Sequence, residues 1–232
     1  MAVNNIKPDI NNPPEVIIEY LLLTIAPIIQ VTKAVKKVTN KPVTAKIRLG
    51  WDNKSINFLE VIKQLEEAGV SMIAIHARTK KDLYTGEPRW DFLKNLRNQM
   101  SVPLVVSGNI YTLDDVINAL EITGADAVMI ARGGEGNPFL IKQINHYFET
   151  GERLENPSLF EQMDYCMELG KAFAEDKGEY SGMRMYRAIA PKFFTGFPNS
   201  KNIRTKLVTE LVALASLERL IDEYKQQIIN IM

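Results

Sequence analysis

At 232 residues, with 46% hydrophobic and 24% charged side chains, the chain can bury the core of one or two globular domains and is neither fibrous nor disordered. Lys and Arg together number 28, as do Asp and Glu, so no global charge draws the chain to nucleic acid or to a membrane. Contact with a polyanion therefore requires a local cluster of cations. The single cysteine, Cys166, excludes an intramolecular disulfide, and no spacing of Cys and His suits a metal site.

The N-terminal stretch predicts neither a signal peptide nor a membrane anchor. It lacks a basic region followed by an apolar core and a cleavage site. The longest apolar run, residues 20–29, is broken by Thr24 and Pro27 and is too short to span a bilayer. With the lone cysteine, this favours a reducing, cytoplasmic setting. Residues 1–15 are rich in Asn and Pro and predict a poorly ordered lead-in.

Strand-like and helix-like segments alternate through the first two thirds of the chain. Short apolar runs predict buried strands at residues 43–49, 72–76, 104–107 and 127–131. Helical spacing follows at 56–66 and again at 90–96, and a third helix is expected from an N-cap at Thr112, with Asp115 at its third position, to Thr123-Gly124. Such alternation predicts a parallel sheet with crossover helices, and both a barrel and a doubly wound sheet are compatible with it.

The pattern changes near residue 156, after which no strand-like run follows. Helical segments are expected at 160–176 and 205–229, separated by a turn-rich stretch at 196–200. We therefore expect an α/β domain at residues 1–155 and a helical domain at 156–232.

Polar and glycine residues gather where the predicted strands end, which is where parallel α/β folds bind their ligands. Ser107-Gly108-Asn109 and Ala131-Arg132-Gly133-Gly134 offer backbone N–H groups, small residues and a cation, as a phosphate site requires. Glycines in such places are also simple turn formers. Lys46 and Arg48 point to the same side of their strand, and they either face an anion or extend to solvent.

Two further groups of residues are candidates for binding. His76, Arg78 and Thr79 follow one strand and can reach the same ligand, although a lone histidine is often structural. Tyr84 and Trp90 either pack at the rim of the sheet or stack on a base. In the helical part, three aromatic residues are interleaved with cations, a mixture that suits RNA but is also found on solvated helix faces. These residues are Arg184, Arg187, Lys192, Phe193, Phe194, Phe197, Lys201, Arg204 and Lys206.

The order and spacing of several motifs closely resemble those of the tRNA-dihydrouridine synthases, which reduce a uridine double bond in tRNA with FMN and NADPH. The resemblance covers residues 41–224. It rests on Pro42-Val-Thr-Ala-Lys-Ile-Arg-Leu-Gly-Trp-Asp52, His76-Ala-Arg-Thr79, Tyr84-Thr-Gly86, Pro103-Leu-Val-Val-Ser-Gly-Asn-Ile110, Thr123-Gly-Ala-Asp-Ala-Val-Met-Ile-Ala-Arg132, Gly136-Asn-Pro138, Met185-Tyr-Arg187 and Gly196-Phe-Pro198.

The resemblance implies a partial (β/α)8 barrel of about four C-terminal β/α units that binds FMN, followed by a helical tRNA-binding domain. It implies that Lys46 contacts the flavin ring and His76 the flavin or its phosphate. It assigns the FMN phosphate to Ser107, Gly108, Asn109, Ala131 and Arg132. It assigns the flavin edge or target uridine to Arg78 and Thr79, and the tRNA to Arg184, Arg187 and Arg204.

This chain departs from the family in several places. Ser107-Gly108-Asn109 stands where the family has Asn-Gly-Asp, and Ala131-Arg132 stands where it has Gly-Arg. The N-terminal strands and the loop that carries the catalytic cysteine have no counterpart, and Cys166 lies elsewhere. We therefore expect an incomplete synthase that needs a second chain, a second copy or an upstream segment. The alternatives are a non-catalytic tRNA-binding module and a flavin-free remnant.

Overall fold

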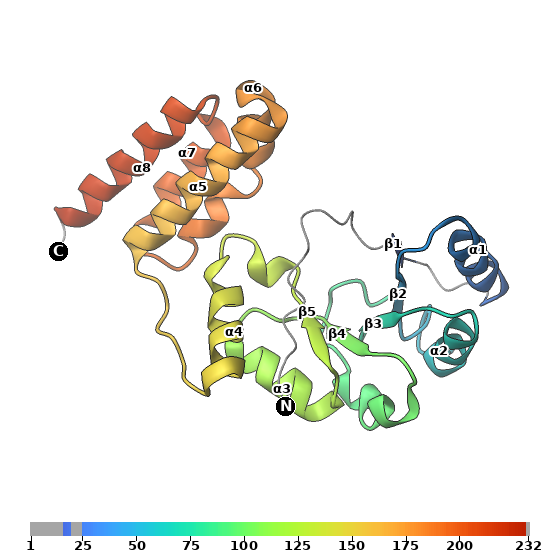
Figure 1. The fold of residues 1–232 in the computed structure, drawn as a ribbon. Helices are drawn as coiled ribbons and strands as arrows, with labels where there is room; N and C mark the ends of the chain where they lie inside the picture. Colours follow the sequence, from blue (N-terminus) through green and yellow to red (C-terminus); the bar gives the residue numbers. More distant parts are fainter. Residues whose placement is uncertain (1–15, 20–24, 231–232) are drawn as a thin grey trace. The chain divides into compact units, whose positions relative to one another are not determined.

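A computed structural model describes residues 16–19 and 25–230 of the protein. The chain divides into two compact units, Met1–Arg132 and Gly133–Met232 (Figure 1). In the described residues, the first unit carries a parallel sheet with helices and the second is helical. The units divide after residue 132, whereas the sequence predicts a domain boundary after residue 155. The difference arises because the helix at residues 139–150 belongs to the second unit. The predicted lead-in at residues 1–15 lies outside the described part of the chain.

Five parallel strands form the sheet of the first unit. They are β1 (Val16–Glu19), β2 (Val43–Arg48), β3 (Met72–His76), β4 (Leu104–Ser107) and β5 (Ala127–Met129). The four predicted strands are confirmed, and two of them match in both bounds. The strand β1 was not predicted, because its four residues run into a longer apolar stretch with no turn residue to mark where the strand ends.

The order of the strands decides between the two architectures that the sequence allows. Each strand pairs with its neighbour in the chain, in the order β1-β2-β3-β4-β5. A doubly wound sheet reverses its strand order at a switch point, whereas a (β/α)8 barrel adds each strand beside the one before it. The prediction of a partial barrel is confirmed, with five strands in place of the four expected.

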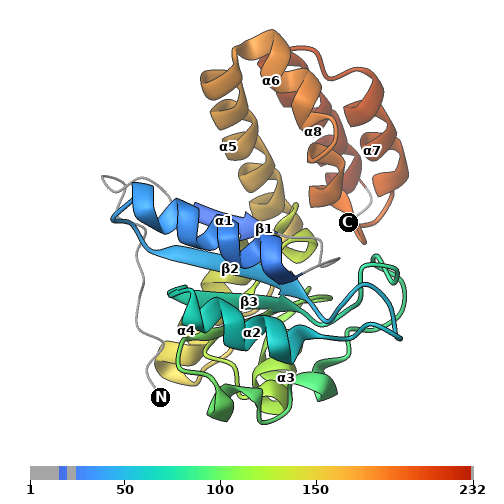
Figure 2. The ribbon, with the colours of Figure 1, turned by 90° about the vertical axis from the view of Figure 1, so that its right-hand side faces the viewer.

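Three helices pack on one face of the sheet. They are α1 (Ile25–Val38), α2 (Phe58–Glu67) and α3 (Leu113–Thr123), and Figure 2 shows α1 and α2 in front of the strands. Alternate strand residues such as Ala45, Ile47 and Ile75 are buried on the same face as these helices. Truncating a buried aliphatic residue of this kind costs about 2–5 kcal/mol.

The connection from β3 to β4 differs from the prediction, since residues 90–96 do not form an α-helix. They form two short 3₁₀ turns, η1 (Trp90–Leu93) and η2 (Leu96–Gln99), separated by Asn95 with φ of 62°. Trp90, Leu93 and Leu96 are all buried. Their spacing of three residues matches the 3₁₀ repeat, which presents every third side chain to the core.

The predicted ends of α3 are confirmed. Thr112 is the N-cap, and its side chain accepts a hydrogen bond from the N–H of Asp115. The Asp115 carboxylate accepts in return from the N–H groups of Tyr111 and Thr112. Aspartate thus completes the reciprocal cap that Glu or Gln more often provides. The helix ends at Gly124, whose φ of 68° suits glycine.

The second unit starts within η3 (Arg132–Gly134) and continues with helices α4 (Phe139–Thr150), α5 (Leu159–Lys177), α6 (Glu179–Tyr186), the 3₁₀ turn η4 (Ala190–Phe194), α7 (Ser200–Thr209) and α8 (Leu214–Ile229). The predicted helix at 160–176 is confirmed. The predicted helix at 205–229 is broken at residues 210–213, where Ala213 takes an extended conformation and the Ser216 hydroxyl accepts from its N–H. In the described residues, no helix is both long and apolar enough to cross a bilayer.

Candidate functional site

One row of side chains runs across the carboxyl ends of four neighbouring strands. In the parallel register, Arg48 pairs with His76, His76 with Ser107, and Ser107 with Met129. Paired residues in a sheet point to the same face, and this is the face opposite to the helices. The strand ends that the sequence singles out therefore do come together. We call Arg48, His76, Ser107 and Met129 the strand-end row.

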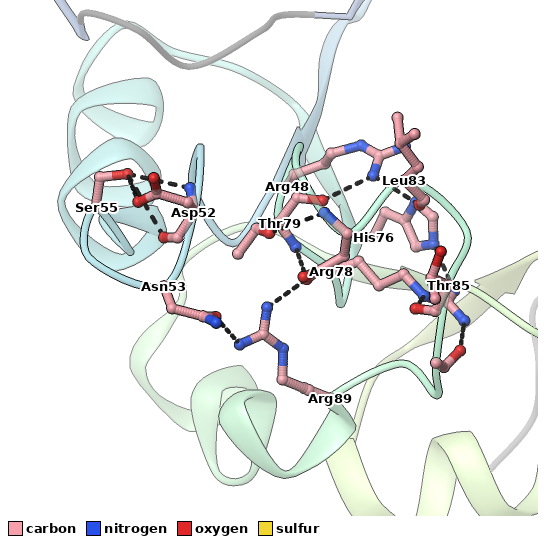
Figure 3. A network of polar contacts seen from close by, with 12 residues as sticks. Arg48, Asp52, Asn53, Ser55, His76, Arg78, Thr79, Leu83, Thr85 and Arg89 are labelled. Atoms are coloured by element: carbon pink, nitrogen blue, oxygen red, sulfur yellow. Dashed lines mark hydrogen bonds and ion pairs between the residues drawn. The ribbon is translucent and has the colours of Figure 1, made fainter.

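Arg78 lies at the centre of the polar contacts beside this row (Figure 3). Its side chain is 1% exposed. Its Nε donates to the carbonyl of Thr85 at 3.3 Å, and one Nη donates to the carbonyl of Gly86 and, at 3.0 Å, to Oδ1 of Asn109. The other Nη lies 3.1 Å from Nε2 of His76. The protein itself thus satisfies most of this guanidinium.

His76 is buried and surrounded by cations. Burial, followed by the positive charges of Arg48, Arg78, Lys46 and Arg132, lowers the pKa of His76 to about 4. The imidazole is therefore neutral at physiological pH. An arginine only donates hydrogen bonds, so the Nε2 that faces Arg78 accepts one, and the ring proton is on Nδ1.

The 83–87 loop covers Arg78 and is held by two arginines from neighbouring strands. Arg48 donates from one Nη to the carbonyls of Thr79 at 3.0 Å and Leu83 at 3.1 Å, while Arg78 holds Thr85 and Gly86. The chain turns at Leu83 with φ of 51°, a conformation that costs a non-glycine residue free energy. The hydrogen bonds to Leu83, Thr85 and Gly86 fix the backbone of the loop.

Tyr84, at the top of the 83–87 loop, exposes 60% of its surface. The guanidinium of Arg132 lies 4.6 Å from the centroid of its ring and that of Arg48 lies 5.9 Å away, while the ring centroid of His76 is at 6.2 Å. Cations in this range are attracted to an aromatic face. An exposed ring is therefore positioned beside the strand-end row.

The sequence indicates that Gly108, in the loop after β4, serves a phosphate site or a turn, but the structure gives it a different role. Gly108 has φ of +123°, and a Cβ there would lie 2.9 Å from Cδ2 of His76 and 3.2 Å from Cβ of Pro88. The glycine therefore makes room for the histidine ring. Asn109 follows in a left-handed conformation, donates to Glu87 at 2.9 Å, and accepts from Arg78 and from Arg132 at 3.3 Å.

The remaining phosphate candidates lie at the end of β5. Ala131 and Arg132 are both exposed, and Arg132 contacts Asn109 and the ring of Tyr84. The N-terminus of α3 is not open to a ligand in the way the sequence allows, because Thr112 and Asp115 already cap it. The Arg132 side chain thus places an exposed cation at the end of β5.

Thr79, expected at the flavin edge or uridine, is fully buried and hydrogen-bonded within the protein. Its N–H donates to the Asp82 carboxylate at 2.7 Å, and its hydroxyl accepts from the N–H of Asp82 at 3.3 Å. Arg89 binds the same carboxylate at 2.5 Å and reaches Asn53 at 2.7 Å. Asp82 and Arg89 were not predicted from the sequence, although Thr79-Lys-Lys-Asp82 repeats the spacing of the Thr112–Asp115 cap.

The three arginines assigned to the helical unit have different environments. Arg184 and Arg204 are exposed, and Arg184 stacks on Tyr180 at 5.4 Å. Arg187 is half-buried, and its Nε donates to the carbonyl of Leu211 at 2.7 Å. The expectation that Phe193 and Phe194 present rings to RNA is wrong, because both lie in the core of the unit at 1% and 0% exposure.

Cys166 belongs to the same helical core. It is fully buried, and the hydroxyl of Tyr186 donates to its carbonyl at 2.7 Å. Burial raises the pKa of the Cys166 thiol to about 12. This thiol is therefore neither exposed nor ionised. No group of His, Cys, Asp and Glu side chains suited to a metal ion is found in the residues the structure describes.

Comparison with known proteins identifies the family. A family model described as "Dihydrouridine synthase (Dus)" matches residues 20–228. The chain belongs to this family. Among named members, a "Probable tRNA-dihydrouridine synthase" of Rickettsia bellii is 35% identical over 175 residues, which are 75% of this chain and 54% of that protein. A "tRNA-dihydrouridine synthase B" of Pseudomonas putida is 34% identical over 177 residues, which are 76% of this chain and 52% of that protein.

The dihydrouridine synthase match extends through both units. Its range of residues 20–228 includes the strand-end row, the 83–87 loop and the helical core. The chain spans about half the length of the curated relatives it matches.

Proposed function

We propose that this chain provides the flavin-phosphate side of a tRNA-dihydrouridine synthase, in which NADPH reduces FMN and the flavin then reduces a uridine of tRNA. The observation that carries the proposal is the cation cluster at the strand ends. The charges of Arg48, Arg78, Lys46 and Arg132 all act on the buried ring of His76. A cluster of this kind favours an anionic ligand.

The residues fit the chemistry of FMN. Phosphate binds best to guanidinium groups and backbone N–H donors, and Arg132 is exposed beside the Ser107–Asn109 loop. Lys46 lies one pleat below Arg48 on the same face of β2, which suits the negative charge of a reduced ring. His76, neutral and protonated on Nδ1, adds a hydrogen-bond donor without further charge. FMN, when bound, supplies the hydride that reduces the uracil double bond.

In this proposal the strand-end groups bind and orient, and Cys166 does not supply the proton that completes the reduction. The thiol of Cys166 is enclosed with Tyr186 in the helical core, where a substrate cannot reach it. A general acid has to lie within hydrogen-bonding distance of the atom that it protonates. We therefore expect negligible dihydrouridine formation from tRNA by the purified 232-residue chain with FMN and NADPH. Measurable product would contradict this part of the proposal.

Flavin binding has its own test, which does not depend on activity. FMN is titrated into the purified chain, and quenching of flavin fluorescence gives the dissociation constant. Loss of one charge-assisted phosphate contact in Arg132→Met should weaken binding at least about tenfold. Lys63→Met, which removes an exposed cation from α2, is the control and should leave the affinity unchanged. A chain that shows no FMN binding at any concentration would favour the flavin-free remnant instead.

We propose that the helical unit contacts the tRNA through exposed polar groups of α7 and α8. An open groove with a volume of about 810 Å³ is lined there by Asn199, Lys201, Asn202, Thr205, Gln227 and Asn230. Amides and a lysine suit the phosphates and base edges of RNA. This groove also supports the alternative function, a tRNA-binding module without catalysis.

A gel shift with unmodified tRNA tests the helical contact. Lys201→Ala, which removes a cation of this groove, should weaken binding, and the loss should shrink as salt is raised because phosphate contacts are screened. Lys171→Ala, which removes an exposed cation of α5, is the matched control. Equal binding by all three proteins would exclude this groove as the tRNA site.

A further inference from the structure

We infer that Arg78 is a positioning residue, which fixes the tautomer of His76 and the backbone of the 83–87 loop, and does not itself bind a ligand. The inference deepens the proposed function and rests on it for the identity of the ligand. The resemblance to the family assigns Arg78 to the flavin edge or the uridine. The contacts of the side chain favour the different role.

Arg78 has few hydrogen-bond donors left for a ligand. A guanidinium carries five N–H groups in a fixed plane. Four contacts within the protein, to Thr85, Gly86, Asn109 and His76, use four of them. With 1% of its surface exposed, the side chain has at most one N–H to offer and no open path to a ligand.

The contacts of Arg78 also hold neighbouring segments in place. The rigid guanidinium of Arg78 donates to two carbonyls of the 83–87 loop, to the ring of His76 on β3, and to the side-chain amide of Asn109 after β4. Planar, multidentate geometry is the property that distinguishes arginine from lysine. Arg78 therefore joins three segments that meet beside the strand-end row (Figure 3).

The contact between Arg78 and His76 fixes the tautomer of the imidazole. Arg78 is a permanent donor, so Nε2 is held as an acceptor and the proton stays on Nδ1. The charged groups that face His76 come from three segments: Lys46 and Arg48 on β2, Arg78 after β3, and Arg132 after β5. Among them, Arg78 has a hydrogen bond to the ring, whereas Arg48 uses its guanidinium on the carbonyls of Thr79 and Leu83.

The experiment uses the chain alone, without FMN, so that its outcome is separate from that of the flavin proposal. The sequence has two histidines, so a long-range nitrogen–proton NMR spectrum of the imidazoles contains two ring systems, and His146→Gln assigns them. In the unmodified protein we expect His76 as the Nδ1–H tautomer, neutral through the physiological range of pH. A ring protonated on Nε2 would overturn the inference directly.

Two variants separate the hydrogen bond from the charge. Arg78→Met removes both, so His76 should lose its single tautomer and its pKa should rise toward the ordinary value. Arg48→Met removes a neighbouring charge and the contacts to Thr79 and Leu83, but no hydrogen bond to the ring, so the pKa should rise while the tautomer is retained. An unchanged Nδ1–H tautomer in Arg78→Met would show that Arg78 does not position the ring.

A third variant covers the case in which Arg78→Met fails to fold. Arg78→Lys keeps the charge, but its compact ammonium group lacks the planar fork of arginine and cannot reach all four acceptors. We expect it to keep the low pKa of His76 and to release the 83–87 loop, seen as faster amide exchange at Thr85 and Gly86. Protection of those amides equal to that in the unmodified protein would contradict the loop-holding role.

Discussion

The ring of His76 packs against the α-carbon of Gly108, where a Cβ would lie 2.9 Å from Cδ2 of the imidazole. The glycine is required on two counts, since its φ of +123° also disfavours any other residue. The residue at position 108, just after β4, thus determines whether the ring of His76 fits at the end of β3.

Gly108→Ala should therefore destabilise the first unit by about 2 kcal/mol or more, from backbone strain and displacement of His76. Both tryptophans, Trp51 and Trp90, lie in this unit, so urea unfolding followed by tryptophan fluorescence reports it. Gly86→Ala is the control for strain alone, because φ is +69° and no atom lies within 4 Å of the added methyl. Its cost should be about 1 kcal/mol. Equal losses in the two variants would rule out the packing explanation.

Arg187→Ala should lower the stability of the helical unit by about 1 kcal/mol, because its Nε donates to the carbonyl of Leu211 after the end of α7. Arg204→Ala, on the exposed side of α7, should change it by less than about 0.5 kcal/mol. Helical circular dichroism during chemical denaturation measures both. If Arg187→Ala lowers stability as expected, weaker tRNA binding by this variant does not show that Arg187 contacts the tRNA.

Cys166 should not react with a thiol reagent in the native protein at neutral pH, since the thiol is buried and its pKa is raised to about 12. One equivalent per chain should react once the helical unit is unfolded in guanidinium. The labelling rate then reports the opening of that unit. Rapid labelling without denaturant would mean that the core around Tyr186 opens readily.

Asp126 should make the first unit more stable above about pH 4 than below it. Although burial alone would raise its pKa, hydrogen bonds from Arg97 and from the N–H of Leu104 lower the pKa below the ordinary 3.8. A carboxyl whose pKa is depressed by folding stabilises above its unfolded value, and that contribution is lost as pH falls through the folded value.

Asp126→Asn tests this contribution. The side chains of Arg97 and Asp126 are 33% and 39% exposed, so solvent screens their interaction. We therefore expect the free energy of unfolding to fall by only about 1 kcal/mol at pH 7. The difference from the unmodified protein should shrink as the pH is lowered below 4. A difference that stays constant from pH 7 to pH 3 would show that the charge of Asp126 is not the cause.

Much of the architecture was open to prediction from the sequence, because its strands are short apolar runs between polar residues and its caps use recognisable side chains. Thr112, Asp115 and Gly124 bound α3 as their types suggest. The break at residues 210–213 was not predictable from local pattern. It depends on the Ser216 cap and on Arg187, which is remote in sequence from the carbonyl that it binds.

The sequence predicted which residues form the candidate site better than it predicted what each of them does. The carboxyl ends of parallel strands must meet, so Arg48, His76 and Ser107 could be brought together from their places in the strands. Burial could not be foreseen, and it separates the enclosed Arg78 and Thr79 from the exposed Arg132. The two phenylalanines of η4 show the same limit, since their alternation with cations indicates a surface while their side chains form a core.

The strand-end row takes one residue from each of four consecutive strands, Arg48, His76, Ser107 and Met129. No segment of the sheet shorter than β2–β5 contains it, so a partly folded chain has no binding site to offer. A ligand of this row consequently recognises only the chain in which all four strands are paired, and it stabilises that state by mass action. An increase in the melting temperature on adding a ligand therefore measures completion of the sheet as well as occupancy of the site.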